Sequence, residues 1–493
     1  MALLSRSTPS PRPVRVLQFG EGNFLRAFID WMIQRLNQKT DFNGQVRIIQ
    51  PLPHGMADQI NAQGGLYTLI LRGIENGKPV EKREIIDVVN DCLNPYTHWP
   101  EAVQLACSSD LRFVFSNTTE AGIEFKPEPY TPEKCQNTFP AKLTSLLYAR
   151  FQAVKGDRQR GLIIIPCELI DQNGSTLKEC IRLYAALWQL PAAFTTWLDQ
   201  ACLFVNTLVD RIVAGYPHAE AARLEAELGY EDKLIDCGEI FHLFVIEGPA
   251  SLEDELPFAK AGLNVIFTDN QAPYRTRKVR FLNGAHTASV LAAILDGLTF
   301  VDEMMADRIF GAFVARAINH DIFPTVNLPD DEKRSFADSV LERFRNPYAQ
   351  HRLLSISLNS VSKWKVRVLP SLLDYVKLKN DLPPTLTFSL AALLRFYEIE
   401  RMDGNTAVGR SVFGKYPIDD SPEVLDTFDA LTGKFAEDAD FHSYAAAALG
   451  ETSFWGDDLN RIPGLTNTVA YYLAHIHVKG TRAVAKSILQ ECR

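Results

Sequence analysis

Three polar side chains, Lys278, Asn283 and His286, stand in the stretch KVRFLNGAH at spacings of i, i+5 and i+8. On a helix that turns about 100° per residue they fall within an arc of roughly 140°, so all three can face one cleft. A lysine can give or take a proton, an amide can stabilise an oxyanion, and a histidine can hold a substrate. Singly, each residue is more typical of a surface, cap or core position, but the combination predicts a site for the reduction of a ketone.

A second motif, FGEGNF at residues 19–24, is typical of a dinucleotide-binding turn. An apolar run at residues 14–19 predicts a buried strand before it, and a helical pattern over residues 23–37 follows. In such a unit the glycines let backbone N–H groups approach a pyrophosphate, whose charge the helix N-terminus favours. Leu25 replaces the third glycine of the usual G-x-G-x-x-G pattern, so the turn alone is also consistent with an ordinary strand–helix connection.

A segment of polar and small residues at 117–122 follows another apolar strand pattern, at the strand end where α/β sheets bind ligands, although an ordinary loop after a strand would have the same pattern. Gln50 ends the strand predicted at residues 46–50, where an acidic residue often binds the ribose 2′-OH of NAD. The choice between NAD and NADP therefore stays open at the level of the sequence. The residues predicted to bind the cofactor are Phe19, Gly20, Gly22, Asn23, Phe24, Arg26, Asn117, Thr118 and Glu120.

Basic residues gather in the second half of the chain, after a predicted helix end. They form either a solvated face or an anion pocket for a substrate carboxylate. An H-x-H pair, His475 and His477, has no Cys, Asp or Glu beside it at ligand spacing, so no metal site is predicted. The basic region comprises Arg345, His351, Lys363, Lys365 and Arg367.

The expected elements change character near residues 271–273. Before this point strand patterns alternate with helical ones, which predicts an α/β fold with an open, largely parallel sheet. GLIIIP at residues 161–166 is the clearest buried strand. A hairpin is predicted around residues 75–78, and a long helix is predicted over residues 192–216. After this point helical patterns dominate and strand patterns nearly vanish, which predicts an all-α domain.

The composition limits the class of protein. A length of 493 residues favours two domains, because one hydrophobic core rarely extends over so long a chain. A hydrophobic content of 46% and a charged content of 23% are typical of a folded, soluble protein, and a net charge of −9 without a basic stripe argues against nucleic-acid binding. The 8 cysteines are scattered without a C-x-x-C pair, and no apolar leader or membrane-length run is present, so we expect a reduced, cytoplasmic protein.

The chain resembles the mannitol dehydrogenase family of long-chain, metal-independent polyol dehydrogenases. The resemblance runs over nearly the whole chain from about residue 14 and rests on FGEGNFLRAFIDW, FVFSNTTEAGI, IIIPCELID, LVDRI, KVRFLNGAHT and FRNPY. It implies a Rossmann-like NAD-binding domain over residues 1–271, followed by an all-α catalytic and substrate-binding domain over residues 272–493.

By this resemblance Lys278, Asn283 and His286 match the family's catalytic K-x4-N-x2-H motif. Lys278 is then the general acid in ketone reduction and the base in alcohol oxidation. Asn283 stabilises the developing alkoxide, and His286 binds the substrate.

The resemblance also implies substrate-binding residues. Asp210 and Arg211 are adjacent in an apolar run, which by itself favours a structural ion pair, but they match the family's V-D-R-I signature. Lys363 matches a lysine of the family's substrate pocket, and Arg367 is a further candidate for binding a carboxylate.

Two departures from the family pattern narrow the substrate. Leu169 stands where polyol-oxidising relatives carry an asparagine that acts as a second oxyanion donor, and Ser355 stands where they carry an arginine. Both changes point away from mannitol and favour the branch that reduces keto-uronates. The implied reaction is the reversible, NAD-dependent reduction of D-tagaturonate to D-altronate in hexuronate (galacturonate) catabolism.

Alternatives remain at this stage. Within the family these are reduction of fructuronate or oxidation of mannitol or arabinitol. In another class the chain is a non-catalytic nucleotide-binding sensor, although a sensor has no need of the proton donor Lys278. The sequence also leaves open the epimer of the keto-uronate, what replaces the missing oxyanion donor, and whether the protein is a monomer or a small homo-oligomer.

Overall fold

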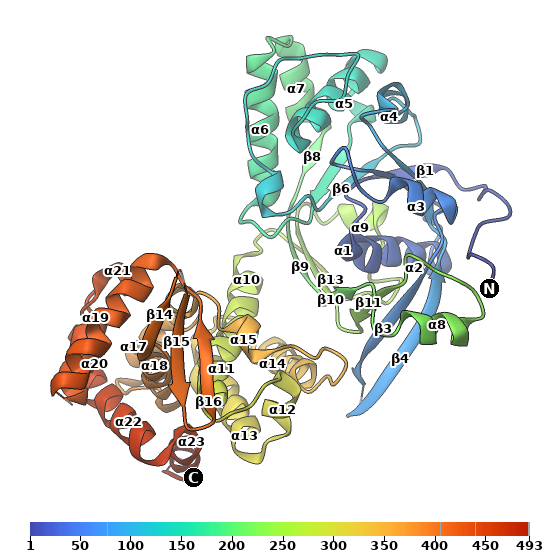
Figure 1. The fold of residues 1–493 in the computed structure, drawn as a ribbon. Helices are drawn as coiled ribbons and strands as arrows, with labels where there is room; N and C mark the ends of the chain where they lie inside the picture. Colours follow the sequence, from blue (N-terminus) through green and yellow to red (C-terminus); the bar gives the residue numbers. More distant parts are fainter. Residues whose placement is uncertain (76, 405, 439, 492–493) are drawn as a thin grey trace. The chain divides into compact units, whose positions relative to one another are not determined.

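The computed structural model describes residues 1–75, 77–404, 406–438 and 440–491 (Figure 1). The chain divides into two compact units. In the described chain, the last residue of the α/β part is Gln271, and the helical part continues from Ala272. The first unit comprises residues 1–73 and 80–271, and the second comprises residues 74–79 and 272–493.

The first unit is built on a six-stranded sheet, and the predicted parallel sheet is confirmed. The strand order β5-β2-β1-β6-β7-β8 corresponds to the order 3-2-1-4-5-6 of doubly wound sheets that bind dinucleotides. In that order the strands are β5 (Val89–Leu93), β2 (Gln45–Ile49), β1 (Val14–Phe19), β6 (Phe113–Ser116), β7 (Ile163–Pro166) and β8 (Leu203–Phe204).

Helices cover both faces of this sheet, and β1 shows how the sequence divides between them. Val16 belongs to the apolar cluster that includes Trp31, whereas Leu17 and Phe19 belong to the cluster that includes Leu143. Successive side chains of a strand point to opposite faces, so an unbroken apolar run fills both layers. One layer contains α2 (Trp31–Lys39) and α3 (Ala57–Ala62), and the other contains α4 (Trp99–Ala106), α5 (Phe139–Ala153), α6 (Asn173–Leu187) and α7 (Ala192–Ala201).

Two smaller sheets complete the first unit. The hairpin predicted around residues 75–78 is present as β3 and β4, and its residue Asn76 lies outside the described residues. In sheet order the strands are β10 (Val213–Gly215), β11 (Asp236–Glu239), β3 (Tyr67–Glu75) and β4 (Lys78–Ile86) in one sheet, and β13 (Val265–Thr268), β12 (Leu243–Glu247) and β9 (Asn206–Asp210) in the other; two short helices are α8 (Ala221–Leu228) and α9 (Leu252–Glu255).

The prediction of one long helix over residues 192–216 is wrong. The helix α7 ends at Ala201, and the chain continues as β8, β9 and β10. Between Asn206 and Val209 half-buried residues alternate with buried ones, which is the period of two expected for a strand. Since β9 pairs antiparallel with β12 and opposes Val209 to Phe244, sheet pairing decides the structure of this apolar segment.

The second unit is helical, as predicted. Its core contains α11 (Ala285–Leu295) and α18 (Pro384–Phe396), which pack against each other, and every residue of α11 is buried. A helix that is apolar on all sides belongs in a core rather than at a surface. The other helices are α10 (Ala272–Lys278), α12 (Val301–Ala306), α13 (Arg308–Arg316), α14 (Asp330–Phe344), α15 (Leu353–Ile356), α16 (Ser360–Arg367), α17 (Leu369–Lys379), α19 (Pro422–Asp438), α20 (Phe441–Leu449), α21 (Thr452–Trp455), α22 (Leu465–Lys479) and α23 (Thr481–Glu491).

A small antiparallel sheet interrupts these helices, and the sequence pattern did not predict it. Its strands are β14 (Ile399–Asp403), β15 (Thr406–Ser411) and β16 (Gly414–Ile418). In β14 only Ile399 is buried, so the strand lacks the apolar alternation from which strands are recognised. His475 and His477, considered above for a strand, lie on the helix α22.

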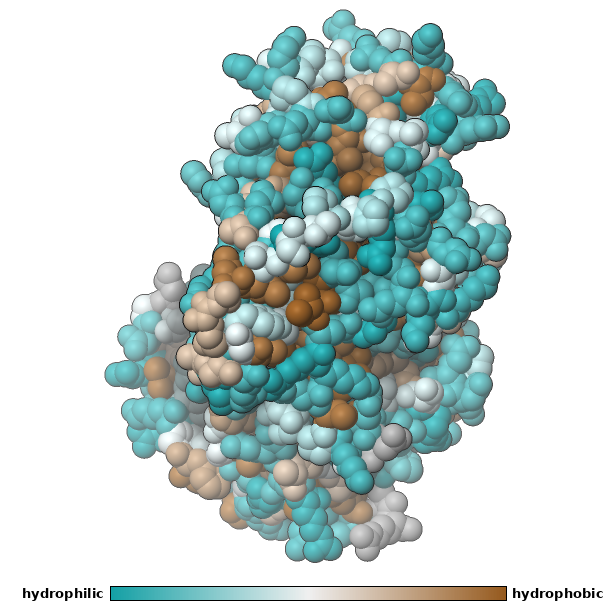
Figure 2. All heavy atoms as spheres, turned by 90° about the vertical axis from the view of Figure 1, so that its right-hand side faces the viewer, coloured by the Kyte–Doolittle hydropathy of each residue, from teal (hydrophilic) through white to brown (hydrophobic). Residues whose placement is uncertain are grey.

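Hydrophilic residues dominate the face of the molecule shown in Figure 2, and hydrophobic residues form small patches on it. Among the exposed apolar side chains, Val412 and Phe413 form the turn between β15 and β16. Over the described part of the chain, no helix combines the length and the apolar character needed to cross a membrane.

Four polar side chains share the core of the first unit: Arg26, Asp30, Tyr67 and Asp236, each at most 1% exposed. The Tyr67 hydroxyl lies 3.2 Å from Asp30 Oδ2, and Arg26 Nη2 lies 3.8 Å from Asp236 Oδ2. Burial raises the pKa of Asp30 to about 8 and that of Asp236 to about 7, although the charge of Arg26 lowers both. Ionised Asp30 is therefore disfavoured in the folded protein.

We expect Asp30→Asn to weaken the pH dependence of stability. The folded-state pKa of Asp30, about 8, lies above its ordinary value of 3.8, so its contribution to stability is complete below the ordinary value and is lost as the pH rises towards about 8. Asparagine has no proton to lose, so the free energy of unfolding of the variant should decrease less steeply over this window, by about one proton in the linkage slope. Urea unfolding at pH 5 to 8 measures the slopes, with exposed Asp41→Asn as the control. Identical slopes for wild type and Asp30→Asn would contradict the expectation.

Candidate functional site

The glycine motif forms a tight turn directly after β1. Gly20 has a φ of +118°, a backbone region that favours glycine. A Cβ on Gly20 would lie 3.0 Å from the Asn117 carbonyl oxygen, whereas nothing lies within 4 Å of the Cβ position at Gly22. The helix that follows runs through α1 (Asn23–Leu25), the π-helical segment η1 (Arg26–Asp30) and α2. The turn therefore presents open space at the N-terminus of a helix, which suits a pyrophosphate.

Three other residues predicted to bind the cofactor, Phe19, Phe24 and Arg26, support this turn by packing and hydrogen bonding within the fold. Phe19 is fully buried, and Arg26 is 1% exposed. Arg26 donates to two main-chain carbonyls and, from Nη2, to Asn23 Oδ1 at 2.6 Å. The Phe24 ring stacks on Phe28 with centroids 5.0 Å apart. These contacts fix the shape of the turn, and for Phe19 and Arg26 they leave no side-chain surface for a ligand.

A buried carboxylate, Glu168, holds the segment that follows β6. Glu168 is 2% exposed and accepts hydrogen bonds from Ser116 Oγ at 3.0 Å, from the Thr118 N–H at 2.9 Å and from Thr118 Oγ1 at 3.0 Å. Burial raises the pKa of Glu168, and these donors oppose the shift. The Asn117 amide donates to the carbonyl that follows β7, at 3.1 Å. The side chain of Glu120 lies outside the described part of the structure.

Asp210 and Arg211, at the end of β9, are buried in the first unit. Each of the three guanidinium nitrogens of Arg211 donates to a main-chain carbonyl, and the group lies 4.1 Å from the centroid of the Trp31 ring. Burial lowers the pKa of Arg211 to about 9. These contacts favour the structural interpretation of Arg211, and substrate binding by Asp210 stays a prediction.

Lys278, Asn283 and His286 lie on one continuous helix of the second unit, made of α10, the π-helical segment η4 (Val279–Gly284) and α11. We call it the catalytic helix after the role predicted for these three residues. In a π-helix residue i bonds to residue i+5, one position further than in an α-helix. Lys278 and Asn283 are five positions apart, so the π-helical segment aligns them more closely than the predicted α-helical arc. Both side chains are half-buried, and within the described residues the Asn283 amide makes no side-chain hydrogen bond.

His286 is buried on α11 among aromatic and basic groups. Its ring stacks on Phe344 at 3.8 Å between centroids, and the ring of His351 lies 5.7 Å away, edge to face. Burial, followed by the charges of His351, Arg343 and Arg367, holds the pKa of His286 well below its usual range, so the imidazole is neutral. Its Nε2 is buried without a hydrogen-bond partner in the described structure, which leaves this atom for a ligand.

Two cations from α16, Lys363 and Arg367, complete a basic cluster near His286. Burial lowers the pKa of both, and the charge of Arg367 lowers that of Lys363 further. Lys363 Nζ donates to the Ile356 carbonyl at 3.0 Å. Among the described residues neither cation has a carboxylate within 4.0 Å. Asp420 is an acid that acts on Lys363 from a greater distance, raising its pKa.

The N-terminus of α16 is held by a pair that the sequence analysis did not select, Tyr397 and Asp420. The Ser360 N–H donates to the Tyr397 hydroxyl at 3.1 Å, and the Val361 N–H lies 3.5 Å from Asp420 Oδ2. The Tyr397 hydroxyl in turn donates to Asp420 Oδ2 at 2.5 Å. A carboxylate at a helix N-terminus accepts hydrogen bonds from free N–H groups and interacts favourably with the positive end of the helix dipole. By fixing the start of α16, this pair positions Lys363 indirectly.

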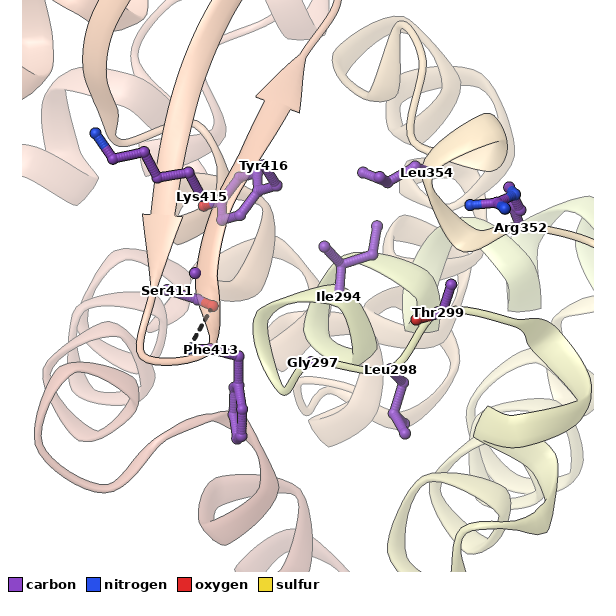
Figure 3. A pocket seen from close by; sticks show the side chains of 11 residues that line it. Ile294, Gly297, Leu298, Thr299, Arg352, Leu354, Ser411, Phe413, Lys415 and Tyr416 are labelled. Atoms are coloured by element: carbon purple, nitrogen blue, oxygen red, sulfur yellow. Dashed lines mark hydrogen bonds between the residues drawn. The ribbon is translucent and has the colours of Figure 1, made fainter.

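A cavity of about 150 Å³ lies elsewhere in the second unit, at the C-terminal end of α11 (Figure 3). Its lining includes Ile294, Arg352, Phe413 and Tyr416, and none of the predicted catalytic residues. Across the part of the chain that the structure describes, no group of three or more His, Cys, Asp or Glu side chains is arranged to hold a metal ion.

Family models match both units of the chain. The mannitol dehydrogenase Rossmann domain matches residues 14–260, and the mannitol dehydrogenase C-terminal domain matches residues 270–477. The chain belongs to the mannitol dehydrogenase family. An altronate oxidoreductase of Yersinia enterocolitica is 45% identical over 473 residues, which is 96% of each chain, and one of Escherichia coli is 46% identical over 478 residues, which is 97% of each chain.

Solved structures share the family's fold. D-sorbitol dehydrogenase in its substrate-free form has a TM-score of 0.79 at 21% identity and covers 98% of this chain and 100% of its own. Mannitol 2-dehydrogenase of Pseudomonas fluorescens, in a ternary complex with NAD and D-mannitol, has a TM-score of 0.66 at 19% identity and covers 99% of this chain and 96% of its own. The predicted Rossmann-like domain followed by a helical domain is thus confirmed.

The helix α16 can lie close to the catalytic helix because position 284 is a glycine. A Cβ on Gly284 would lie 2.9 Å from the Arg367 carbonyl oxygen, which is closer than real contacts allow. We expect Gly284→Ala to destabilise the protein by about 1–3 kcal/mol through overpacking, and to weaken substrate binding because α16 must shift. Urea unfolding and steady-state kinetics measure the two effects.

A matched control for this variant exists in α19. Gly433, also helical, has nothing within 4 Å of its Cβ position, so Gly433→Ala should stabilise the protein by up to about 1 kcal/mol through helix propensity. Stabilisation by both alanines would contradict the close contact at Gly284.

Proposed function

We propose that the protein is an NAD-dependent altronate oxidoreductase, or tagaturonate reductase, which reduces D-tagaturonate to D-altronate reversibly. Relatives of that name, at 45% and 46% identity over nearly the whole chain, support this function. The structural observation that carries it is the basic cluster near His286, in which Lys363 and Arg367 have no carboxylate within 4.0 Å among the described residues. A keto-uronate brings the negative charge that such a cluster lacks, whereas a neutral polyol does not.

The first unit fits the cofactor. The open space at Gly22 follows β1, and Asn117 and Thr118 follow β6, the neighbouring parallel strand. Both segments lie at carboxyl ends of strands, which suits the pyrophosphate and ribose of a dinucleotide. A mannitol dehydrogenase of the same fold, solved in a complex with NAD, supports the choice of this cofactor. The nicotinamide supplies a hydride to the ketone carbon in reduction.

The residues of the catalytic helix handle the proton and the developing charge. Lys278 gives a proton to the carbonyl oxygen in reduction and takes it back in oxidation. The Asn283 amide donates a hydrogen bond to the developing alkoxide. Leu169, at the position of the family's second donor, is apolar and 58% exposed, so Asn283 acts without a second amide from that position. Neutral His286 binds a substrate hydroxyl through Nε2.

The substrate carboxylate is bound by Lys363, with Arg367 as a second cation. Both lie on one face of α16, four positions apart, so a single carboxylate can contact both groups. The neighbouring ring of His351 adds a donor from the region that the sequence marked as basic. The reaction then belongs to hexuronate breakdown. We propose that the enzyme is cytoplasmic and that it is a monomer or a small homo-oligomer.

Replacement of the proposed proton donor tests the reaction. We expect Lys278→Ala to lower kcat for tagaturonate with NADH by about 10²–10⁴-fold while NADH binding persists, because the variant lacks the general acid. Absorbance in the NADH band measures turnover of tagaturonate, fructuronate and fructose by wild type and variant. Preference for fructuronate or fructose would refute the substrate assignment, and NADH binding without turnover in the wild type would favour a nucleotide sensor.

A second pair of variants tests the carboxylate site. We expect Lys363→Met to raise KM for tagaturonate by about tenfold or more, with a smaller effect on kcat, because the lost ion pair acts on the bound substrate. Lys365→Met removes an equal charge from the same helix and should leave KM within about twofold of wild type. Equal effects of the two variants would show that the general field, and not a contact at Lys363, binds the anion.

A further inference from the structure

The strand end that usually selects between NAD and NADP carries no acid in this chain. The segment after β2, residues 50–56, reads QPLPHGM. Gln50 itself is 2% exposed, and both ends of its amide are engaged: Nε2 donates to the Leu52 carbonyl at 2.8 Å, and Oε1 accepts from the Ala57 N–H at 3.0 Å. Gln50 therefore braces the loop that leads into α3 and has no spare group for a ribose.

A carboxylate reaches the same place from the glycine turn. Glu21 stands between the two glycines of the motif, and its Oε1 lies 2.2 Å from the position that a Cβ on Gly55 would take. The side-chain amide carbon of Gln50 lies 2.7 Å from that same position. Glu21 and Gln50 are thus neighbours across Gly55, and the Met56 N–H hydrogen-bonds to the Glu21 carboxylate. The loop after β2 has no acidic residue of its own, and it packs against the carboxylate of Glu21.

The charges around this carboxylate favour a neutral ribose. The segment from Gln50 to Met56 contains no Lys or Arg, so a phosphate on the ribose would meet no cation there. Arg26, a cation that acts on Glu21, is 1% exposed, and its guanidinium donates to Asn23 and to main-chain carbonyls. A carboxylate can accept a hydrogen bond from a ribose 2′-OH, and it repels a 2′-phosphate at the same position.

We propose that Glu21 is the residue that selects NAD over NADP, accepting from the ribose 2′-OH in place of the acid missing after β2. The inference rests on the proposed function only in that a dinucleotide binds at the glycine turn. It assigns to the turn itself a role that sequence patterns place at the end of the second strand. It also explains Gly55, since any side chain at that position would collide with the Glu21 carboxylate.

Equilibrium binding of NADH and NADPH, without substrate, tests the assignment on the full-length protein. Nucleotide fluorescence or calorimetry gives Kd for wild type, Glu21→Gln and Glu21→Ala. We expect wild type to bind NADPH at least about 100-fold more weakly than NADH, and both variants to tighten NADPH binding by about tenfold or more, since the repulsion is removed. For Glu21→Gln, which keeps the shape of the side chain, Kd for NADH should rise by about three- to tenfold, because a neutral amide oxygen accepts a weaker hydrogen bond from the ribose than a carboxylate does.

Two further acids serve as comparisons. Asp41→Asn removes the same charge from an exposed position before β2, at the opposite end of that strand, and should leave the NADPH to NADH ratio of Kd unchanged. Asp58, exposed in the first turn of α3, is the rival acid near the loop. Relaxed selectivity in Asp58→Asn with none in the Glu21 variants would overturn the proposal, as would equal binding of NADH and NADPH by wild type. Failure to turn over tagaturonate would leave this binding result intact, so the two proposals fail separately.

Discussion

The close approach of Gly284 to the Arg367 carbonyl is the contact on which the site of the second unit depends. Without a Cβ at this position, α16 lies directly against the catalytic helix, and Arg367 comes near enough to help keep His286 neutral. Lys363, one turn earlier on α16, acts on His351 in the same way. Desolvation and like charge act together here, so the cluster favours an anion and disfavours any further proton. A backbone contact thus sets the electrostatics of the basic cluster.

In the first unit, unlike the basic cluster of the second, the buried charged groups of Arg26 and Glu168 are hydrogen-bonded within the fold. Arg26 lies beside Asp236 and near Asp30, and every nitrogen of its guanidinium donates inside the fold. Glu168 accepts one hydrogen bond from Ser116, the last residue of β6, and two from Thr118 in the segment that follows. Leaving such groups unpaired would cost several kcal/mol, so satisfied groups of this kind are structural and fix the loops around the dinucleotide turn. Lys363 and Arg367 have no carboxylate within 4.0 Å among the described residues, which is why we propose that they bind a ligand.

The sequence predicts those parts that local pattern controls. Apolar runs identify β1 and β7, the glycine turn follows from its motif, and the spacing of Lys278, Asn283 and His286 places them on one helix. The π-helical segment η4, which packs against α16, escapes prediction because the apolar pattern does not distinguish a π-helical turn from an α-helix. The segment after α7 forms β9 because the partner strand β12 is available, and β14 is too polar to show a strand pattern. Asp420 and Tyr397 are far from Lys363 in sequence, so no local pattern connects them with the basic cluster.

Under the two proposals, selectivity follows from the sign of the charge that each unit presents to its ligand. In the first unit Glu21 presents a carboxylate where a ribose hydroxyl is acceptable and a phosphate is not. In the second unit Lys363 and Arg367 present cations where a carboxylate is acceptable and a neutral polyol gains little. An exposed pair of charges contributes at most about 1 kcal/mol, too little for strong discrimination, so both sites must depend on partial burial. Glu21, Lys363 and Arg367 are all half-buried, which is the condition that gives each charge its effect while leaving it reachable.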